Sequence, residues 1–178
     1  MRAAAVAGIL NGMMHTAAIV LADGARLGVR PISPDDRDTF SSWFGRLTAE
    51  SRRRRFLGPK PKLSARELTY LTEVDNVSHT ALIAVDDEGR MVGEARYATG
   101  DPTSRVGDFA ITVADSWQGR GVGTRLAARI VEAARANGMT KLTAITLWDN
   151  TAAIGLLHSL GFLRAGYQGD AIEYELAL

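Results

Sequence analysis

A glycine-rich segment in the second half of the chain has the residue types and the spacing to bind an anion. It reads Gln118, Gly119, Arg120, Gly121, Val122, Gly123 and Thr124. Such a loop can turn several backbone N–H groups toward one point, because glycine accepts φ values that other residues avoid. An amphipathic segment follows directly and is expected to form a helix. The N-terminus of that helix, the positive end of its dipole, would point at the anion and strengthen its binding. The segment therefore predicts a receptor for a pyrophosphate.

Two other phosphate-binding loops fit this segment poorly. The dinucleotide-binding fingerprint G-x-G-x-x-G opens a helix near the start of a parallel sheet, whereas the spacing here is G-x-G-x-G after an apparent antiparallel meander. A P-loop needs a lysine before its serine or threonine, and here Gly123 directly precedes Thr124. A glycine-rich turn that binds nothing stays open as the third interpretation.

Composition excludes several kinds of site. The 178 residues include no cysteine, which removes thiolate nucleophiles and disulfides. The three histidines, His15, His79 and His158, are isolated and have no acid pair at ligand spacing, so we expect no metal. Lysine and arginine number 21 against 20 acidic residues, a net charge of +1, which gives the whole chain no electrostatic preference for nucleic acid or an anionic membrane.

Arg52–Arg55 is the one strongly basic run. Three interpretations are open: a solvated or internally paired segment, a rim that attracts an acidic substrate or the phosphate of a cofactor, and a nucleic-acid contact. Nucleic acid is the weakest of the three, because few aromatic residues lie among these arginines and the net charge is small.

The N-terminal residues 1–16 read as a flexible extension. Their apolar run, Ala3–Leu10, follows a single arginine and is far too short to span a membrane. We therefore expect no membrane association and a cytoplasmic location. Residues 17–178 are expected to form the one folded domain.

The elements that would position these residues follow from hydrophobic periodicity and turn signals. Strands are expected at 17–21 and 26–32 around Asp23-Gly24, at 79–100 as a pair, at 104–115, at 141–148, and as a pair over 162–178. Helices are expected from Ser33, from Ser64 with a capping box at Glu67, from the glycine loop to Gly138, and over 150–160. The segment Glu50–Lys62 belongs to neither of the first two helices. This order predicts a single mixed α/β or α+β domain.

Two motifs in this order resemble a known family. Gln118–Gly123 resembles the acyl-CoA signature of the Gcn5-related N-acetyltransferase (GNAT) superfamily, and "NTAAIGLLHSLGF", from Asn150 to Phe162, resembles its second motif. The segments "RPISPDD", "LTAESRRRRF", "GEARY" and "VGDFAITVADSWQGRGVGT" are most similar to the catalytic domain of bacterial protein lysine acetyltransferases. The likeness covers roughly residues 26 to 162.

The resemblance implies a fold and a binding mode for acetyl-CoA. The sheet would be mixed and mostly antiparallel, flanked by helices, with its central strands 108–113 and 141–148 splayed apart. Asn150 would bond the pantetheine arm, a role compatible with capping its helix. The cofactor-binding residues would be Ile111, Thr112, Val113, Gln118, Gly119, Arg120, Gly121, Val122, Gly123, Thr124 and Asn150.

Acetyl transfer to an amine needs a base, because an alkylammonium with a pKa of about 10.4 cannot attack a thioester until it loses a proton. The lysine-acetyltransferase pattern has a glutamate in the strand before the glycine loop, and alignment of "VGDFAITV" brings Asp108 to that place. Aspartate is one methylene shorter, so a water could relay the proton. Glu94 is the second candidate, although strand alternation favours its pointing outward to solvent.

The general acid is absent from its usual place. Many members of the superfamily carry a tyrosine four residues before the Gly-Phe pair, and here that residue is Leu157, which has no proton to donate. His158 is next to it but points about 100° away around a helix, so we interpret it as a surface or packing residue.

The sequence thus predicts an acetyl-CoA-dependent N-acetyltransferase that acts on a protein lysine by direct amine attack and that could form a homodimer. The alternatives are acetylation of a small amine, such as an aminoglycoside, polyamine or amino acid, and a CoA-binding sensor without turnover.

Overall fold

The computed structural model describes residues 17–178; the expected N-terminal extension, residues 1–16, lies outside this described part of the chain. The strands are β1 (Ala17–Val20), β2 (Arg26–Pro31), β3 (His79–Val85), β4 (Met91–Ala98), β5 (Val106–Val113), β6 (Lys141–Leu147), β7 (Leu163–Gln168) and β8 (Ala171–Ala177). The α-helices are α2 (Arg37–Arg46), α3 (Ala49–Phe56), α4 (Ala65–Thr72), α5 (Val122–Ala136) and α6 (Thr151–Ser159), and short 3₁₀ turns are η1 (Pro34–Asp36) and η2 (Asp115–Trp117).

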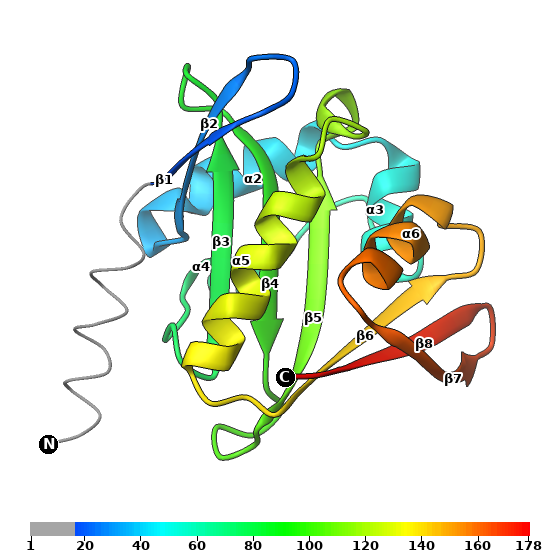
Figure 1. Cartoon of the computed structure of the whole chain (residues 1–178). Helices are drawn as coiled ribbons and strands as arrows, with labels where there is room; N and C mark the ends of the chain where they lie inside the picture. Colours follow the sequence, from blue (N-terminus) through cyan, green and yellow to red (C-terminus); the bar gives the residue numbers. More distant parts are fainter. Residues whose placement is uncertain (1–16) are drawn as a thin grey trace, which may run out of the picture.

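The eight strands form one sheet in the order β1-β2-β3-β4-β5-β6-β8-β7 (Figure 1). Every neighbouring pair is antiparallel except β5 and β6, which run parallel. The α5 helix is the crossover that a parallel pair requires. The expected mixed, mostly antiparallel sheet is confirmed.

Helices cover both faces of the sheet, which gives two apolar cores. On one face α5 lies across β3, β4 and β5, and its Leu126 and Ile130 are completely buried (Figure 1). On the other face α2 buries Phe40, Trp43 and Phe44 against β3 and β4. None of the helices between residues 17 and 178 is long and apolar enough to cross a membrane.

Local sequence signals account for most element boundaries. The capping box before α4 forms as expected: Glu67 N–H donates to Ser64 Oγ at 3.2 Å, and Ser64 N–H donates to Glu67 Oε2 at 2.8 Å. Gly138 has φ of +76° just beyond α5, which is the left-handed conformation expected of a glycine there. The hairpin around Asp23-Gly24 also forms.

The basic segment is the main departure from expectation. Residues Glu50–Lys62 were assigned to neither of the flanking helices, and no helix was expected from Ala49 to Phe56, which forms a helix of its own, α3. Thr48 starts this helix, since its Oγ1 accepts a hydrogen bond from Ser51 N–H at 3.1 Å, and Leu57 ends it in the left-handed region with φ of 57°. Arginine is a good helix former, so four in a row are compatible with a helix whose polar side chains find partners.

Candidate active site

The parallel strands β5 and β6 separate soon after they begin. Only Val106, Gly107 and Asp108 pair with β6, opposite Lys141, Leu142 and Thr143. Beyond this point β5 continues along β4 as far as Val113, and β6 continues along β8 as far as Leu147. The expected splay is confirmed, and it leaves two facing strand edges whose backbone groups are open to a ligand.

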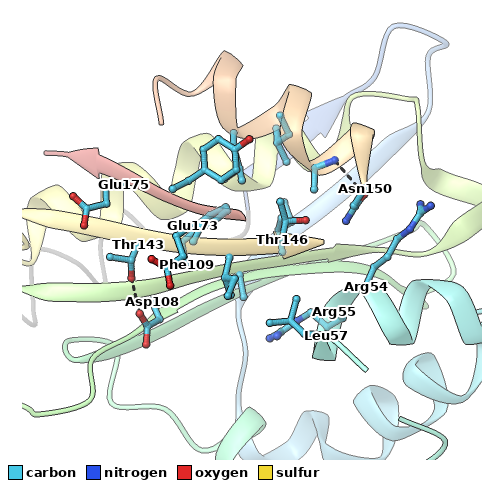
Figure 2. A pocket seen from close by; sticks show the side chains of 18 of the residues that line it. Arg54, Arg55, Leu57, Asp108, Phe109, Thr143, Thr146, Asn150, Glu173 and Glu175 are labelled. Atoms are coloured by element: carbon cyan, nitrogen blue, oxygen red, sulfur yellow. Dashed lines mark hydrogen bonds between the residues drawn. The ribbon is translucent and has the colours of Figure 1, made fainter. Parts of the chain in front are cut away.

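A cleft opens where the strands diverge. One cavity of about 570 Å³ contains the side chains of Asp108 and Thr143, and a second of about 460 Å³ extends along the glycine loop. Because both cavities are lined by Arg54, Arg55 and Asn150, we treat them as one continuous space, the central cleft. Figure 2 shows the first cavity, with Asp108 and Thr143 toward one end and Arg54 and Arg55 toward the other.

The glycine loop enters α5 in the way the sequence predicts. Gly119 and Gly121 have φ of +70° and +85°, values that L-residues with side chains rarely adopt. Gly121 is also the N-cap of α5 and makes no side-chain capping bond, so the N–H groups of the first turn are free to bind an anion. Gly123 packs differently: a Cβ there would sit 3.7 Å from side-chain atoms of Leu156 and Val113.

Most of the expected cofactor-binding residues line the second cavity together. These are Ile111, Thr112, Val113, Gln118, Gly119, Gly121, Gly123, Thr124 and Asn150. Arg120 and Val122 do not line it. The Arg120 guanidinium pairs with Asp23 at 2.7 Å and stacks 4.1 Å from the Trp117 ring centroid, and Val122 is buried in the core.

Two polar side chains fasten the glycine loop to α3. Gln118 Nε2 donates to the carbonyl oxygen of Val113 at 3.0 Å and to Ser51 Oγ at 3.3 Å. The Asp115 carboxylate accepts from the backbone N–H of Thr48 at 3.0 Å, from its hydroxyl at 2.7 Å and from Ser51 Oγ at 2.7 Å. Burial would raise the pKa of Asp115, but these donors outweigh it and hold the pKa below its ordinary value. Asp115 was not recognised from the sequence, because its partners lie more than sixty positions earlier in the chain.

The arginines of the basic run are paired within the protein. Arg52 donates to the carbonyl oxygen of Pro61 at 3.2 Å, and Arg53 reaches Asp149 at 2.6 Å. Arg54 pairs with Glu50 at 2.7 Å. Arg55 pairs with Glu94 at 3.2 Å. Of the three interpretations, these contacts favour the internally paired segment, while Arg54 and Arg55 also contribute to the walls of the cleft.

Asp108 occupies the last paired position before β5 and β6 diverge. Its carboxylate is exposed, lines the first cavity and accepts a hydrogen bond from Thr143 Oγ1 at 2.5 Å. A carboxylate fixed at this point can reach a group bound between the two strands, which is the position that a general base requires.

Glu94 is in different surroundings from those expected. It is 1% exposed, so the expectation that it points to solvent is wrong, because β4 is covered on both faces and alternation does not apply to it. Its carboxylate pairs with Arg96 at 2.8 Å and with Arg55 at 3.2 Å. Burial would raise the pKa of Glu94, but the charges of Arg96 and Arg55 outweigh it and lower the pKa below its usual range. Glu94 lines neither cavity of the cleft.

The second motif supplies packing as well as a polar group. Asn150 caps α6, since its Oδ1 accepts from the N–H of Ala153 at 3.3 Å, and it lines both cavities. Leu157 is 3% exposed and belongs to the core. His158 is exposed and packs edge-on against Tyr174, with 5.5 Å between the ring centroids, which agrees with its interpretation as a packing residue.

Three further polar residues line the first cavity and were not recognised from the sequence. Thr146 is 4% exposed, and its hydroxyl has no hydrogen-bond partner among residues 17–178. Glu173 and Glu175, on β8, contribute two carboxylates (Figure 2). Their place depends on the pairing of β6 with β8, which no local signal in the sequence reveals.

The fold and the cleft place the protein in a class. The chain belongs to the acetyltransferase (GNAT) family, whose model matches residues 46–162, and the superfamily expected from the two motifs is thereby confirmed. It is accordingly an N-acetyltransferase.

Two acetyltransferases and one solved structure are similar to most of this chain. The acetyltransferase PA5475 of Pseudomonas aeruginosa is 32% identical over 163 residues, which are 89% of this chain and 87% of the relative. The acetyltransferase Pat of Mycolicibacterium smegmatis is 28% identical over 75% of this chain, but this chain spans only 40% of Pat. The crystal structure of the GNAT domain of S. lividans PAT superposes with a TM-score of 0.85 at 29% identity, over 92% of this chain and 97% of that one.

Proposed function

We propose that the protein transfers an acetyl group from acetyl-CoA to the side-chain amine of a protein lysine. The observation that carries this proposal is the central cleft, because its two adjoining cavities share lining residues, one of them following a glycine loop at a helix N-terminus and the other holding an exposed carboxylate at the strand divergence. The resemblance of the chain to the catalytic domain of bacterial protein lysine acetyltransferases supports a protein acceptor, and the similarity to the GNAT domain of S. lividans PAT and to the acetyltransferase Pat agrees with it.

The residues of the second cavity fit acetyl-CoA. The first-turn N–H groups of α5, with the loop glycines before them, would receive the pyrophosphate. The open edge of β5, near Ile111 and Val113, and the side chain of Asn150 would bond the pantetheine amides. Thr112 adds a buried hydroxyl that has no hydrogen-bond partner among the described residues and lines the same cavity.

Asp108 is the general base in this proposal. It would remove a proton from the lysine ammonium, directly or through a water, so that the neutral amine attacks the thioester carbonyl. The amine nitrogen then forms the new amide bond and loses its extra proton as the carbon–sulfur bond breaks. The CoA thiolate takes up a proton from solvent or from the protonated Asp108 and leaves as the thiol. Glu94 is less suited to this role, since it is enclosed, paired with two arginines and has a lowered pKa.

A panel of acceptors tests the proposal. The intact protein would be incubated with acetyl-CoA and, separately, with a lysine peptide, a polyamine and free amino acids, and thiol release would be followed. We expect release with the peptide, and mass spectrometry should locate the acetyl group on the lysine side chain. Release only with a small amine would move the function to that class, and CoA binding without any release would indicate a sensor.

A further inference from the structure

Carboxylates gather on one side of the first cavity. Thr143 of β6 pairs with Asp108 of β5 on one side and with Glu175 of β8 on the other, so the three side chains lie in a row across the sheet on one face. Glu173 is two positions from Glu175 and therefore shares that face. Figure 2 shows Asp108, Thr143, Glu173 and Glu175 together, away from Arg54 and Arg55. We call Asp108, Glu173 and Glu175 the acidic wall.

The acidic wall is only partly neutralised. Lys141 pairs with Glu175 at 2.9 Å, and Thr143 donates to Asp108. The Glu173 side chain is exposed, and its carboxylate makes no hydrogen bond or ion pair with any residue between 17 and 178. Gly166 on β7 lies beside it, and a Cβ at Gly166 would be 3.2 Å from Glu173 Oε2, so the glycine leaves space for this carboxylate.

An independent feature indicates that the same cavity receives a polar ligand. The Thr146 hydroxyl is buried at 4% exposure, lines the cavity and has no hydrogen-bond partner among residues 17–178. A buried hydroxyl without a partner costs free energy unless a ligand or water bonds to it. Thr146 is three residues from Thr143 and therefore lies on the opposite face of β6, so polar groups line this cavity from both faces of the strand.

One carboxylate, that of Asp108, is enough to serve as the general base. The carboxylate of Glu173 is therefore free to interact with another part of the acceptor. The reacting amine must become neutral, and surplus negative charge beside it would favour its protonated form. A second positive charge that stays protonated during the reaction would instead be attracted without opposing the chemistry. With strands about 4.8 Å apart and residues about 3.3 Å apart along a strand, Glu173 lies roughly 12 Å from Asp108 across the sheet, which is within three or four residues of an extended peptide.

We propose that Glu173 is a specificity-determining residue that selects acceptor lysines with a second basic residue nearby in the peptide. This inference rests on the proposed lysine acetylation and names the peptides that the enzyme prefers. Glu173 contacts the flanking residue and not the reacting amine.

Three peptides of one sequence test the inference. Each has one central lysine, and its flanking positions carry arginine, glutamine or glutamate, so that only the central residue can be acetylated at a side chain. With saturating acetyl-CoA, we expect kcat/KM for the arginine-flanked peptide to exceed that for the glutamine-flanked peptide by about two- to fivefold, the size expected of one solvent-exposed charge pair. The ratio should fall as salt is added.

Two variants assign the preference to Glu173. In Glu173→Gln the ratio should approach one, and in Glu173→Lys it should invert in favour of the glutamate-flanked peptide, which a purely structural role would not produce. Glu132→Gln, on the exposed side of α5, is the matched control and should keep the wild-type ratio. Circular dichroism would show that all three variants fold.

The outcomes separate this inference from the proposed function. If the wild type acetylates all three peptides equally, or if Glu173→Gln keeps the wild-type ratio, the inference is wrong and lysine acetylation stands. If the wild type acetylates none of the peptides but acetylates a small amine, both are overturned.

Discussion

Asp108 is held at the strand divergence by one hydrogen bond from Thr143 and is otherwise open to the cleft. If it removes the ammonium proton, Asp108→Asn keeps the size of the side chain and loses its basicity. We expect kcat/KM to fall by about 10²- to 10⁴-fold, with the affinity for acetyl-CoA nearly unchanged. A rise in pH should restore part of the loss, because more of the acceptor amine is then neutral.

Pre-steady-state and pH-dependent rates would test this expectation, with Asp87→Asn, in the exposed β3–β4 turn, as a matched control. A wild-type rate in Asp108→Asn would remove the assignment. Glu94→Gln is not a useful comparison with Asp108→Asn, because it removes the charge that pairs with the buried Arg96. Loss of one partner of a buried ion pair typically costs about 3–5 kcal/mol of the free energy of unfolding.

The free energy of unfolding should depend on pH through a single residue, His79. Its pKa falls to about 4 because of burial and the nearby charge of Arg96, whose Nη1 lies 3.0 Å from its Nε2. In the unfolded chain the pKa returns to about 6.5. Between these values the unfolded state binds the extra proton, so the free energy of unfolding should decrease as pH falls from about 6.5 to about 4 and change no further through this group below that.

Urea unfolding across this range would measure the effect, and His79→Gln should flatten the part of the slope that His79 contributes. An unchanged slope in that variant would show that other groups carry the pH dependence. Asp75 and Glu94 lie near the imidazole, so their own titration must be separated from it by the same comparison.

At the scale of elements, Asp115 joins η2 to the start of α3. Asp115→Ala removes three hydrogen bonds to a partly buried carboxylate, and we expect a loss of about 2–3 kcal/mol in the free energy of unfolding. The glycine loop should also lose its anchor to α3, so KM for acetyl-CoA should rise. Asp101→Ala, which removes a comparable carboxylate from an exposed turn, is the control. Equal KM values in the two variants would contradict the anchoring role.

The sequence predicted those elements whose signals are local. Glycine positions, the Ser64–Glu67 capping box and the hairpin turns encode their own geometry within a few residues, and each of them formed. Helix α3 was not expected because four consecutive arginines read as a solvated run, while the groups that pair with them, such as Glu94 and Asp149, lie far along the chain. Glu94 itself was placed outward because burial on both faces of β4 depends on helices that arrive from elsewhere.

The glycine loop and Asp108 could be chosen as candidates from the sequence because the motif and the strand before it lie in one stretch, and the structure places both at the cleft. Their roles in binding and catalysis stay predictions. Thr146, Glu173 and Glu175 could not be chosen in this way, since they enter the cleft through the β6–β8 register, and a shift of one residue would turn them to the other face.

Acidic and basic residues nearly balance over the whole molecule, but they are separated from one another along the cleft. The net charge is +1, yet the cleft has carboxylates at one end and Arg54 and Arg55 at the other (Figure 2). Because Arg54 and Arg55 are paired with Glu50 and Glu94, the carboxylate end has the less compensated charge, which suits the positively charged acceptor proposed above. The homodimer expected from the sequence stays a prediction.

The central claim is that the glycine loop at the start of α5 binds the pyrophosphate of acetyl-CoA. Gly121→Glu would add a side chain and a negative charge there, at a residue with φ of +85°, so it also strains the backbone. Gly138→Glu carries a similar strain and the same charge at the far end of α5, where φ is +76°, and separates the two effects. Calorimetric titration with acetyl-CoA should show binding by the wild type and by Gly138→Glu, and none by a folded Gly121→Glu. Wild-type affinity in Gly121→Glu would contradict the account.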